Sequence, residues 1–91
     1  MNARSAIGWN LRKFRLARGL SQERLALEAG IDRAYLGRIE RGSENVTVST
    51  LELVAKALEI PVGMLFEEPE PGSTRPGPLR SGRKARRDRA Q

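Results

Sequence analysis

The sequence predicts an all-α fold, a compact five-helix domain over residues 1–66 that is followed by a disordered, basic tail over residues 67–91. Apolar residues recur at helical spacing in a series of short segments, and residues suited to caps and turns separate these segments. No segment shows the sustained alternation of a strand. Four of the five prolines follow Phe66, where apolar residues become rare. Such a tail cannot bury enough surface to offset its ordering entropy.

The composition excludes several classes of site. The chain has no cysteine and no histidine, so it lacks disulfides, thiolate metal ligands and the commonest general base. No paired carboxylates, nucleophile–base pair or metal-ligand spacing is visible, and we expect no enzyme, no catalytic residue, no metal and no cofactor. The apolar runs are too short to span a membrane and the N-terminus lacks the core of a signal peptide, which predicts a cytoplasmic protein.

The charge of the chain points to a polyanionic partner. The net charge is +6; residues 1–66 hold 10 basic and 7 acidic residues, and residues 67–91 hold 7 basic and 4 acidic residues. Nucleic acid is the first candidate for such a protein and an anionic membrane surface the second. The basic cluster from Arg80 to Arg89 fits either an arm that touches phosphates without reading sequence or a solubilising tail.

A first helix is predicted over residues 4–18, and Gly19 ends it. Its apolar stripe consists of Ile7, Leu11, Phe14 and Ala17. Arg15 lies beside this stripe, so we expect it to be partly buried and paired. Trp9 fits either the edge of the core or an exposed position.

Two short helices joined by a tight turn are predicted over about residues 21–29 and 32–41. Ser21 and Asp32 are suited to cap their N-termini, and Gly30 is suited to the left-handed residue that ends the first of them. The apolar positions of the pair are Leu25, Ala26, Ala29, Leu36 and Ile39. Helices joined by so short a turn are typical of the DNA-binding helix-turn-helix.

The second helix of this pair divides into two faces at about 100° per residue. One face carries Arg33, Ala34, Gly37, Arg38 and Arg41, and the other carries Tyr35, Leu36, Ile39 and Glu40. Arginines can bind guanine edges as a fork, and small neighbours let a helix settle into the major groove. The alternative is a solvated basic face with an accidental glycine.

The rest of the domain is predicted as a loop and two helices. The loop over residues 43–48 is expected to cross the surface with one of its two valines buried. A helix over about 50–58 follows, with Ser49 as N-cap and Glu52 completing a capping box. Pro61 is expected to open a last helix over about 61–66. The apolar residues of these helices are Leu51, Val54, Ala55, Leu58, Val62, Leu65 and Phe66.

Several of these elements form one linked pattern. It comprises Arg15, Gly19-Leu20-Ser21-Gln22, Leu25-Ala26, Gly30, Tyr35-Leu36, Ile39-Glu40, Gly42, Leu51, Leu53, Ala55, Ala57-Leu58 and Leu65-Phe66. With this pattern, residues 4–66 resemble the Cro/repressor-type (XRE) helix-turn-helix family of bacterial and phage transcription regulators. The resemblance implies a lambda-repressor-like DNA-binding fold with a helix-turn-helix over about 21–41, whose recognition helix is about 32–41. It also implies a homodimer on double-stranded DNA in the bacterial nucleoid, without a small-molecule effector.

The resemblance assigns roles to matching positions. Base reading falls to Arg33, Ala34 and Arg38, and phosphate contact to Gln22, Tyr35, Gly37, Arg41 and Ser43. Arg15 and Glu40 match a structural ion pair between the first helix and the recognition helix. Two positions depart from the family: Gly37 stands where serine is common, and Asp32 places a negative charge near DNA, where it can cap the helix and orient Arg33.

Val62 and Phe66 are candidates for a dimer interface, although both could instead close the core, where we place Leu65. The resulting hypothesis is a sequence-specific transcriptional regulator, for example a restriction–modification controller or a phage-type repressor. The alternative is an antitoxin or coactivator-like adaptor whose main ligand is a partner protein.

Overall fold

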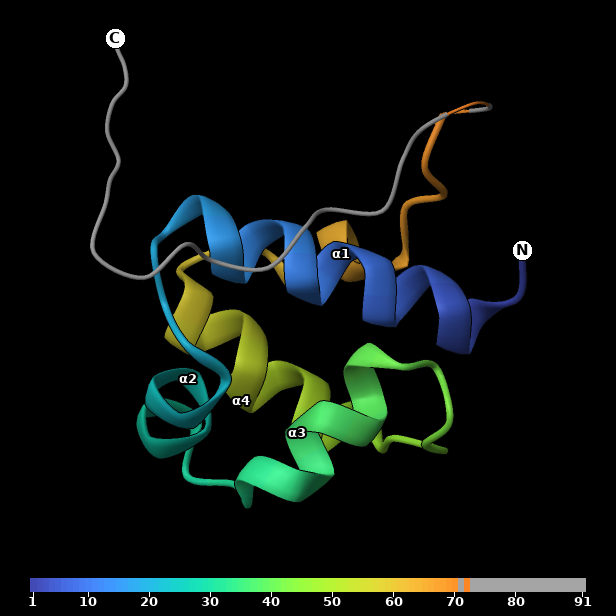
Figure 1. Ribbon diagram of the computed structural model, residues 1–91. Helices are drawn as coiled ribbons and strands as arrows, with labels where there is room; N and C mark the ends of the chain where they lie inside the picture. The colour runs from blue at the N-terminus through green and yellow to red at the C-terminus, as the bar shows by residue number, and fades with distance from the viewer. Residues whose placement is uncertain (71, 73–91) are drawn as a thin grey trace, which may run out of the picture.

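The computed structural model describes residues 1–70 and 72, and over these residues the all-α fold is confirmed (Figure 1). The elements are α1 (Ala3–Ala17), α2 (Gln22–Ala29), α3 (Arg33–Glu40), α4 (Val48–Leu58) and the 3-10 helix η1 (Val62–Phe66). The described part of the chain contains no strand. The basic cluster from Arg80 to Arg89, and the arm hypothesised for it, lie outside the described residues.

α1 begins one residue earlier than predicted, because Asn2 caps it. The side chain of Asn2 accepts a hydrogen bond of 2.9 Å from the backbone N–H of Ser5. The helix ends where expected, since Gly19 follows in the left-handed region with φ of +69°. Its N–H donates to the carbonyl of Leu16 at 2.9 Å.

The turn between α2 and α3 is built as predicted. Ser21 accepts from the N–H of Arg24 at 3.0 Å, and Asp32 accepts from the N–H of Tyr35 at 3.1 Å. Gly30 adopts φ of +74° between the two helices. Both N-caps and the left-handed residue therefore have the roles that their side chains predicted.

The start of α4 corrects the prediction. The helix begins at Val48, and Thr47 rather than Ser49 is its N-cap. The hydroxyl of Thr47 accepts from the N–H of Thr50 at 3.1 Å. The side chains of Thr47 and Ser49 can both cap a helix. Capping by Thr47 lengthens the helix by two residues, and this costs little in packing because Val48 is 66% exposed. The predicted capping box between Ser49 and Glu52 is therefore absent.

The last element also differs from the prediction. Pro61 has extended backbone angles (φ −64°, ψ 141°) and precedes a single 3-10 turn instead of opening an α-helix. The N–H of Met64 donates to the carbonyl of Pro61 at 3.0 Å, the i to i+3 bond of such a turn. Asn10 of α1 anchors its end by donating to the carbonyls of Leu65 at 3.0 Å and Glu67 at 2.6 Å.

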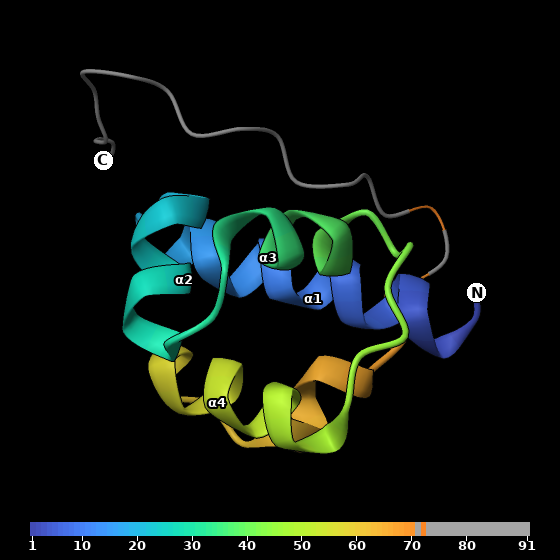
Figure 2. The same ribbon diagram turned by 90° about the horizontal axis from the view of Figure 1, so that it is seen from below.

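The elements enclose the core as a ring: α1 packs against α3, α3 against α2, α2 against α4, α4 against η1, and η1 against α1. In Figure 2, α2 and α3 lie along α1 on one side of the molecule, and α4 and η1 form the other side. The buried core residues are Ile7, Leu11, Leu25, Ala26, Ala29, Leu36, Ile39, Leu51, Val54, Ala55, Leu58 and Leu65.

The apolar stripe predicted for α1 is only partly buried. Phe14 is half-buried against the core, whereas Ala17, in the last turn, is exposed. Trp9 is half-buried. Val46, in the loop before α4, is partly buried against the core, as predicted for one of the two valines, whereas Val48 begins α4 and is 66% exposed.

Candidate nucleic-acid interface

One face of α3 is exposed and carries the arginines. Arg33, Ala34 and Arg38 are exposed, whereas Leu36, Ile39 and Glu40 are buried. Figure 1 shows α3 at the lower edge of the molecule, and Figure 2 looks onto that edge. The helix therefore presents a basic surface outward and an apolar surface to the core, as its periodicity predicted, except that Gly37, which was placed on the basic face, is buried.

Arg33 extends from the first turn of α3. Within the described part of the chain it makes no hydrogen bond or ion pair. Asp32 caps the N–H of Tyr35 and makes no hydrogen bond or ion pair with Arg33, so it does not orient the Arg33 side chain in this structure. The guanidinium of Arg33 thus keeps all five of its donors available to a partner.

Arg38 is held by two neighbours. Its Nε donates to Oε1 of Glu44 at 2.8 Å, and its Cζ lies 5.6 Å from the ring centroid of Tyr35. The hydrogen bond with Glu44 raises the pKa of Arg38 above its ordinary value. Among the described residues, no hydrogen bond engages its two terminal nitrogens.

Within the described residues, Glu44 belongs to this face, and the sequence did not predict it there. Its partner lies six positions earlier, across the end of α3, so no helical spacing relates the two. The available signal was Gly42, which adopts φ of +75° and turns the chain back along the helix.

Ser43 closes the C-terminus of α3. Its N–H and its hydroxyl both donate to the carbonyl of Arg38, at 3.1 and 3.2 Å. Both donors of Ser43 are thereby engaged with the helix end. The geometry gives Ser43 a capping role, and the phosphate contact that the resemblance implied stays a prediction.

The side chain of Gln22, the first residue of α2, contacts the C-terminal end of α3. Its Nε2 donates to Oε1 of Glu40 at 3.0 Å. A Cβ placed on Gly37 would lie 3.4 Å from Nη1 of Arg41 and 3.8 Å from Oε1 of Gln22. The Gly37 backbone therefore lies next to two of the residues to which the resemblance assigned phosphate contacts, and Gly37 itself is buried.

The ion pair expected between Arg15 and Glu40 is present and buried. Arg15 Nε lies 2.5 Å from Oε2 of Glu40, and Nη2 lies 3.1 Å from Oε1. The two side chains are 5% and 1% exposed. Arg15 also donates to the carbonyl of Leu20 at 2.8 Å. Together with Gln22, the pair ties α1, α2 and α3 to one another behind the basic face.

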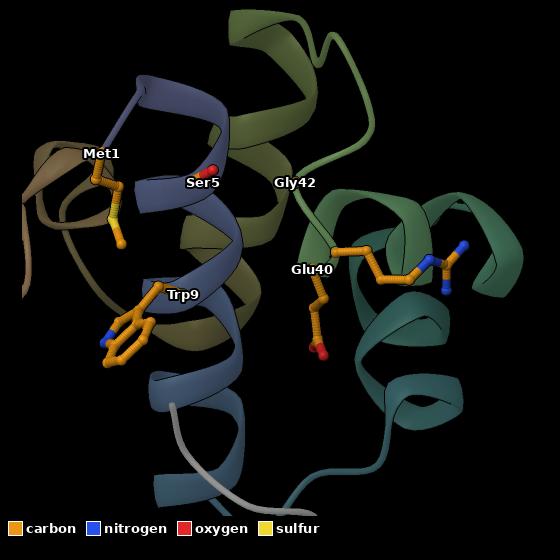
Figure 3. Close-up of a pocket in the computed structure, with 6 residues that line it drawn as sticks. Met1, Ser5, Trp9, Glu40 and Gly42 are labelled. Atoms are coloured by element: carbon orange, nitrogen blue, oxygen red, sulfur yellow. The ribbon is translucent and has the colours of Figure 1, made fainter. Parts of the chain in front are cut away.

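A hollow of about 250 Å³ lies beside this network, between α1 and the end of α3 (Figure 3). It is lined by Met1, Ser5, Trp9, Glu40, Arg41 and Gly42. Figure 3 shows Glu40 pointing into the space between the two helices. Because this carboxylate already accepts bonds from Arg15 and Gln22, we assign the hollow no ligand.

The dimer candidates lie away from α3. Both belong to η1, which packs mainly against α1 and α4. Phe66 is 46% exposed, whereas Val62 is half-buried against the core and Leu65 is fully buried. Within the described residues, no helix is both long and apolar enough to cross a bilayer, and no three acidic side chains gather into a metal site.

Comparison with known proteins agrees with the geometry. The model of the HTH_3 family, described as helix-turn-helix, matches residues 11–65. The control protein C.SmaI of Serratia marcescens is 43% identical over 66 residues, which are 72% of this chain and 79% of that protein. Further relatives that match about 60 residues of this chain carry the name HTH-type transcriptional regulator.

Two solved structures are similar over the same region. The restriction–modification controller C.AhdI from Aeromonas hydrophila is 44% identical, with a TM-score of 0.68 over 69% of this chain and 96% of that one. The controller C.Esp1396I, solved as a tetramer in complex with its natural 35 base-pair operator, is 38% identical. The TM-score is 0.66, over 72% of this chain and 87% of that chain. The chain therefore belongs to the Cro/repressor-type (XRE) helix-turn-helix family.

Proposed function

We propose that this chain is a sequence-specific DNA-binding transcriptional regulator that binds a two-fold operator as a homodimer, with α3 in the major groove. The observation that carries the proposal is the exposed face of α3, which combines free arginine donors with a small residue and is fixed from behind by a buried ion pair. Such a face can approach base edges closely without reorganisation of the helix.

Base reading is assigned to Arg33, Ala34 and Arg38. The guanidinium of Arg33 is available for a fork to O6 and N7 of guanine, and so are the terminal nitrogens of Arg38. Ala34 is exposed between them and suits contact with a thymine methyl.

Phosphate contact is assigned to Gln22, Tyr35 and Arg41. Gln22 lies at the N-terminus of α2, where free N–H groups and the helix dipole favour an anion. Its amide has two donors, of which Glu40 takes one, so one remains for a phosphate. A phosphate would meet Gln22 and Arg41 before it met the buried Gly37, and we propose no direct contact there.

The homodimer is proposed to form through η1, where Phe66 is exposed and Val62 is half-buried. One recognition helix reads only a few base pairs, so a dimer with its helices about 34 Å apart would read two half-sites. The similarity to C.SmaI, C.AhdI and C.Esp1396I supports a controller of a restriction–modification system as the particular kind of regulator.

Selection from a random duplex pool with the purified chain, at near-physiological salt, tests the proposal. The expected result is enrichment of a two-fold symmetric sequence whose half-sites lie about one helical turn apart. Sedimentation of the same preparation, free and bound to the enriched duplex, reports the number of chains on the site.

The opposite result is weak binding to every duplex with a steep dependence on salt. That result would leave only an electrostatic surface and would favour an adaptor that binds a partner protein. In that case Arg33→Ala combined with Arg38→Ala would leave partner binding intact, because an adaptor has no use for arginines on this face.

A further inference from the structure

Glu44 is the acidic member of the proposed DNA-binding face and has no role in the assignments above. It lies in the loop between α3 and α4, and its Oε1 accepts from Nε of Arg38 at 2.8 Å. The side chain of Glu44 is 27% exposed and that of Arg38 is 45% exposed. The pair thus lies at the surface, beside the base-reading positions.

The backbone fixes Glu44 relative to Arg38. The adjoining residue, Ser43, donates twice to the carbonyl of Arg38, at 3.1 and 3.2 Å. Gly42 makes the turn with φ of +75°, and a Cβ on it would lie 3.4 Å from Cα of Ser5 on α1. The carboxylate is therefore presented from a loop that is hydrogen-bonded to the end of α3 and lies against α1.

Arg38 is held on one edge and on one face. Glu44 engages Nε, and the ring of Tyr35 lies against the guanidinium at 5.6 Å from its centroid. What remains is the terminal pair of nitrogens, which make no hydrogen bond with the described residues. A guanidinium anchored in this way can offer a guanine one geometry, end-on, instead of several.

The carboxylate has a second effect. A negative charge on a surface that faces phosphates lowers the affinity for every duplex, whatever its sequence. Restraint of Arg38 favours the correct base pair and so increases selectivity. Repulsion of phosphate lowers the affinity for all duplexes by a similar factor and leaves the ratio between them unchanged.

We propose that Glu44 is a positioning residue that sets sequence selectivity, because it holds Arg38 for the reading of one base pair. Its charge also weakens binding to DNA in general. The inference rests on the proposed function, in which Arg38 reads a base. It identifies Glu44 as the residue that determines how strictly Arg38 discriminates between base pairs.

The test compares Glu44→Ala, Glu44→Gln, Arg38→Ala and the double variant Arg38→Ala/Glu44→Ala. The probes are the duplex that the wild-type chain enriches, its single base-pair variants and an unrelated duplex. Glu44→Ala should bind the unrelated duplex more tightly, and its selectivity should fall about threefold to tenfold, part of what a complete arginine–guanine fork provides. The loss should be confined to the base pair at which Arg38→Ala becomes indifferent.

The other variants separate restraint from charge. Glu44→Gln keeps an oxygen that can accept from Nε and loses the charge, so it should bind all duplexes more tightly and keep the preference at that base pair. In the Arg38→Ala background, Glu44→Ala should change no base preference. Glu28→Gln is the matched control, because Arg24 Nε lies 2.9 Å from Glu28 in an exposed pair on α2.

Distinct results overturn the inference. It is wrong if Glu44→Ala keeps the full preference at the Arg38 base pair, if it still lowers selectivity without Arg38, or if Arg38→Ala weakens all duplexes equally. A wild-type chain that enriches no sequence overturns the proposed function itself. A wild-type chain that enriches an operator, with Glu44 variants of unchanged selectivity, overturns only the role of Glu44. Circular dichroism of each variant reports its folding independently.

Discussion

Gly8 of α1 lies directly against the backbone carbonyl of Glu40 at the end of α3. A Cβ on Gly8 would be 2.5 Å from the oxygen of Glu40 and 2.6 Å from that of Ile39. Real Cβ atoms do not approach backbone oxygens so closely, so α1 and α3 can meet here only because Gly8 has no side chain. The same approach brings Arg15 and Glu40 into reach of each other, since they lie on these two helices.

Substitution Gly8→Ala should therefore destabilise the domain. The clash is with backbone, which cannot rotate away, and overpacking of this kind costs about 1–3 kcal/mol. Urea unfolding followed by circular dichroism measures the change. Gly63→Ala is the control, because nothing lies within 4 Å of its Cβ position. A gain of about 0.5–1 kcal/mol from Gly8→Ala, as for an exposed helical glycine, would contradict the close approach.

The buried pair of Arg15 and Glu40 gives a second prediction. Glu40→Gln leaves the arginine buried without a countercharge, and breaking such a pair by removing one partner costs about 3–5 kcal/mol. Glu28→Gln removes an exposed partner of Arg24 and should cost at most about 1 kcal/mol. Unfolding free energies of the two variants test the contrast. Equal, small losses would show that the Arg15–Glu40 pair does not hold α1 to α3.

The N-cap of α4 can be tested by two alanine variants. Thr47→Ala removes the hydroxyl that accepts from Thr50 and should cost about 1 kcal/mol, within the usual range of 0.5–2 for a lost N-cap. Ser49→Ala lies inside the helix and should change the stability little. Thermal unfolding of both variants decides between them. A larger loss of stability from Ser49→Ala than from Thr47→Ala would show that Ser49 is the N-cap.

Variants of Leu65 and Phe66, which are neighbours in η1, test the core and the proposed dimer interface separately. Leu65 is fully buried, so Leu65→Ala should destabilise the domain by about 2–5 kcal/mol. Phe66 is 46% exposed, so Phe66→Ser should leave the fold intact. It should weaken self-association about tenfold or more, which corresponds to a loss of about 1.4 kcal/mol in the free energy of association.

Sedimentation equilibrium at several concentrations measures self-association directly. Unfolding is measured at the same concentrations, because dimer formation itself stabilises the folded chain. Unchanged self-association of Phe66→Ser would place the interface elsewhere, and a monomeric wild-type chain would contradict the proposed homodimer.

The features that could be predicted from the sequence are those set by near neighbours in the chain. Ser21 and Asp32 cap the N–H groups three residues ahead, and Gly30 supplies a left-handed residue directly after a helix. The exposed arginine face follows from helical periodicity alone. The contact of Arg15 with Glu40 spans 25 positions, and only the family resemblance pointed to it.

The features that could not be predicted depend on distant parts of the chain. Gly8 matters because of a carbonyl on α3, and Asn10 because of carbonyls more than 50 positions away. Thr47 and Ser49 have equivalent capping chemistry, so their local sequence does not distinguish them. Glu44 meets Arg38 only because the chain reverses at Gly42. The selectivity proposed for this pair therefore depends on the same reversal.

The measurement that tests the central claim most directly is the base preference of Arg33→Ala on the duplex enriched by the wild-type chain. Arg33 is exposed and makes no bond within the described residues, so its removal should leave the fold unchanged. Arg4→Ala, another exposed arginine, is the matched control.

If α3 reads the major groove, Arg33→Ala should lose about 1–3 kcal/mol on the enriched duplex and become indifferent at one base pair of each half-site, with its other preferences unchanged. A uniform loss on all duplexes, with every base preference retained, would contradict the claim and leave Arg33 as a phosphate contact.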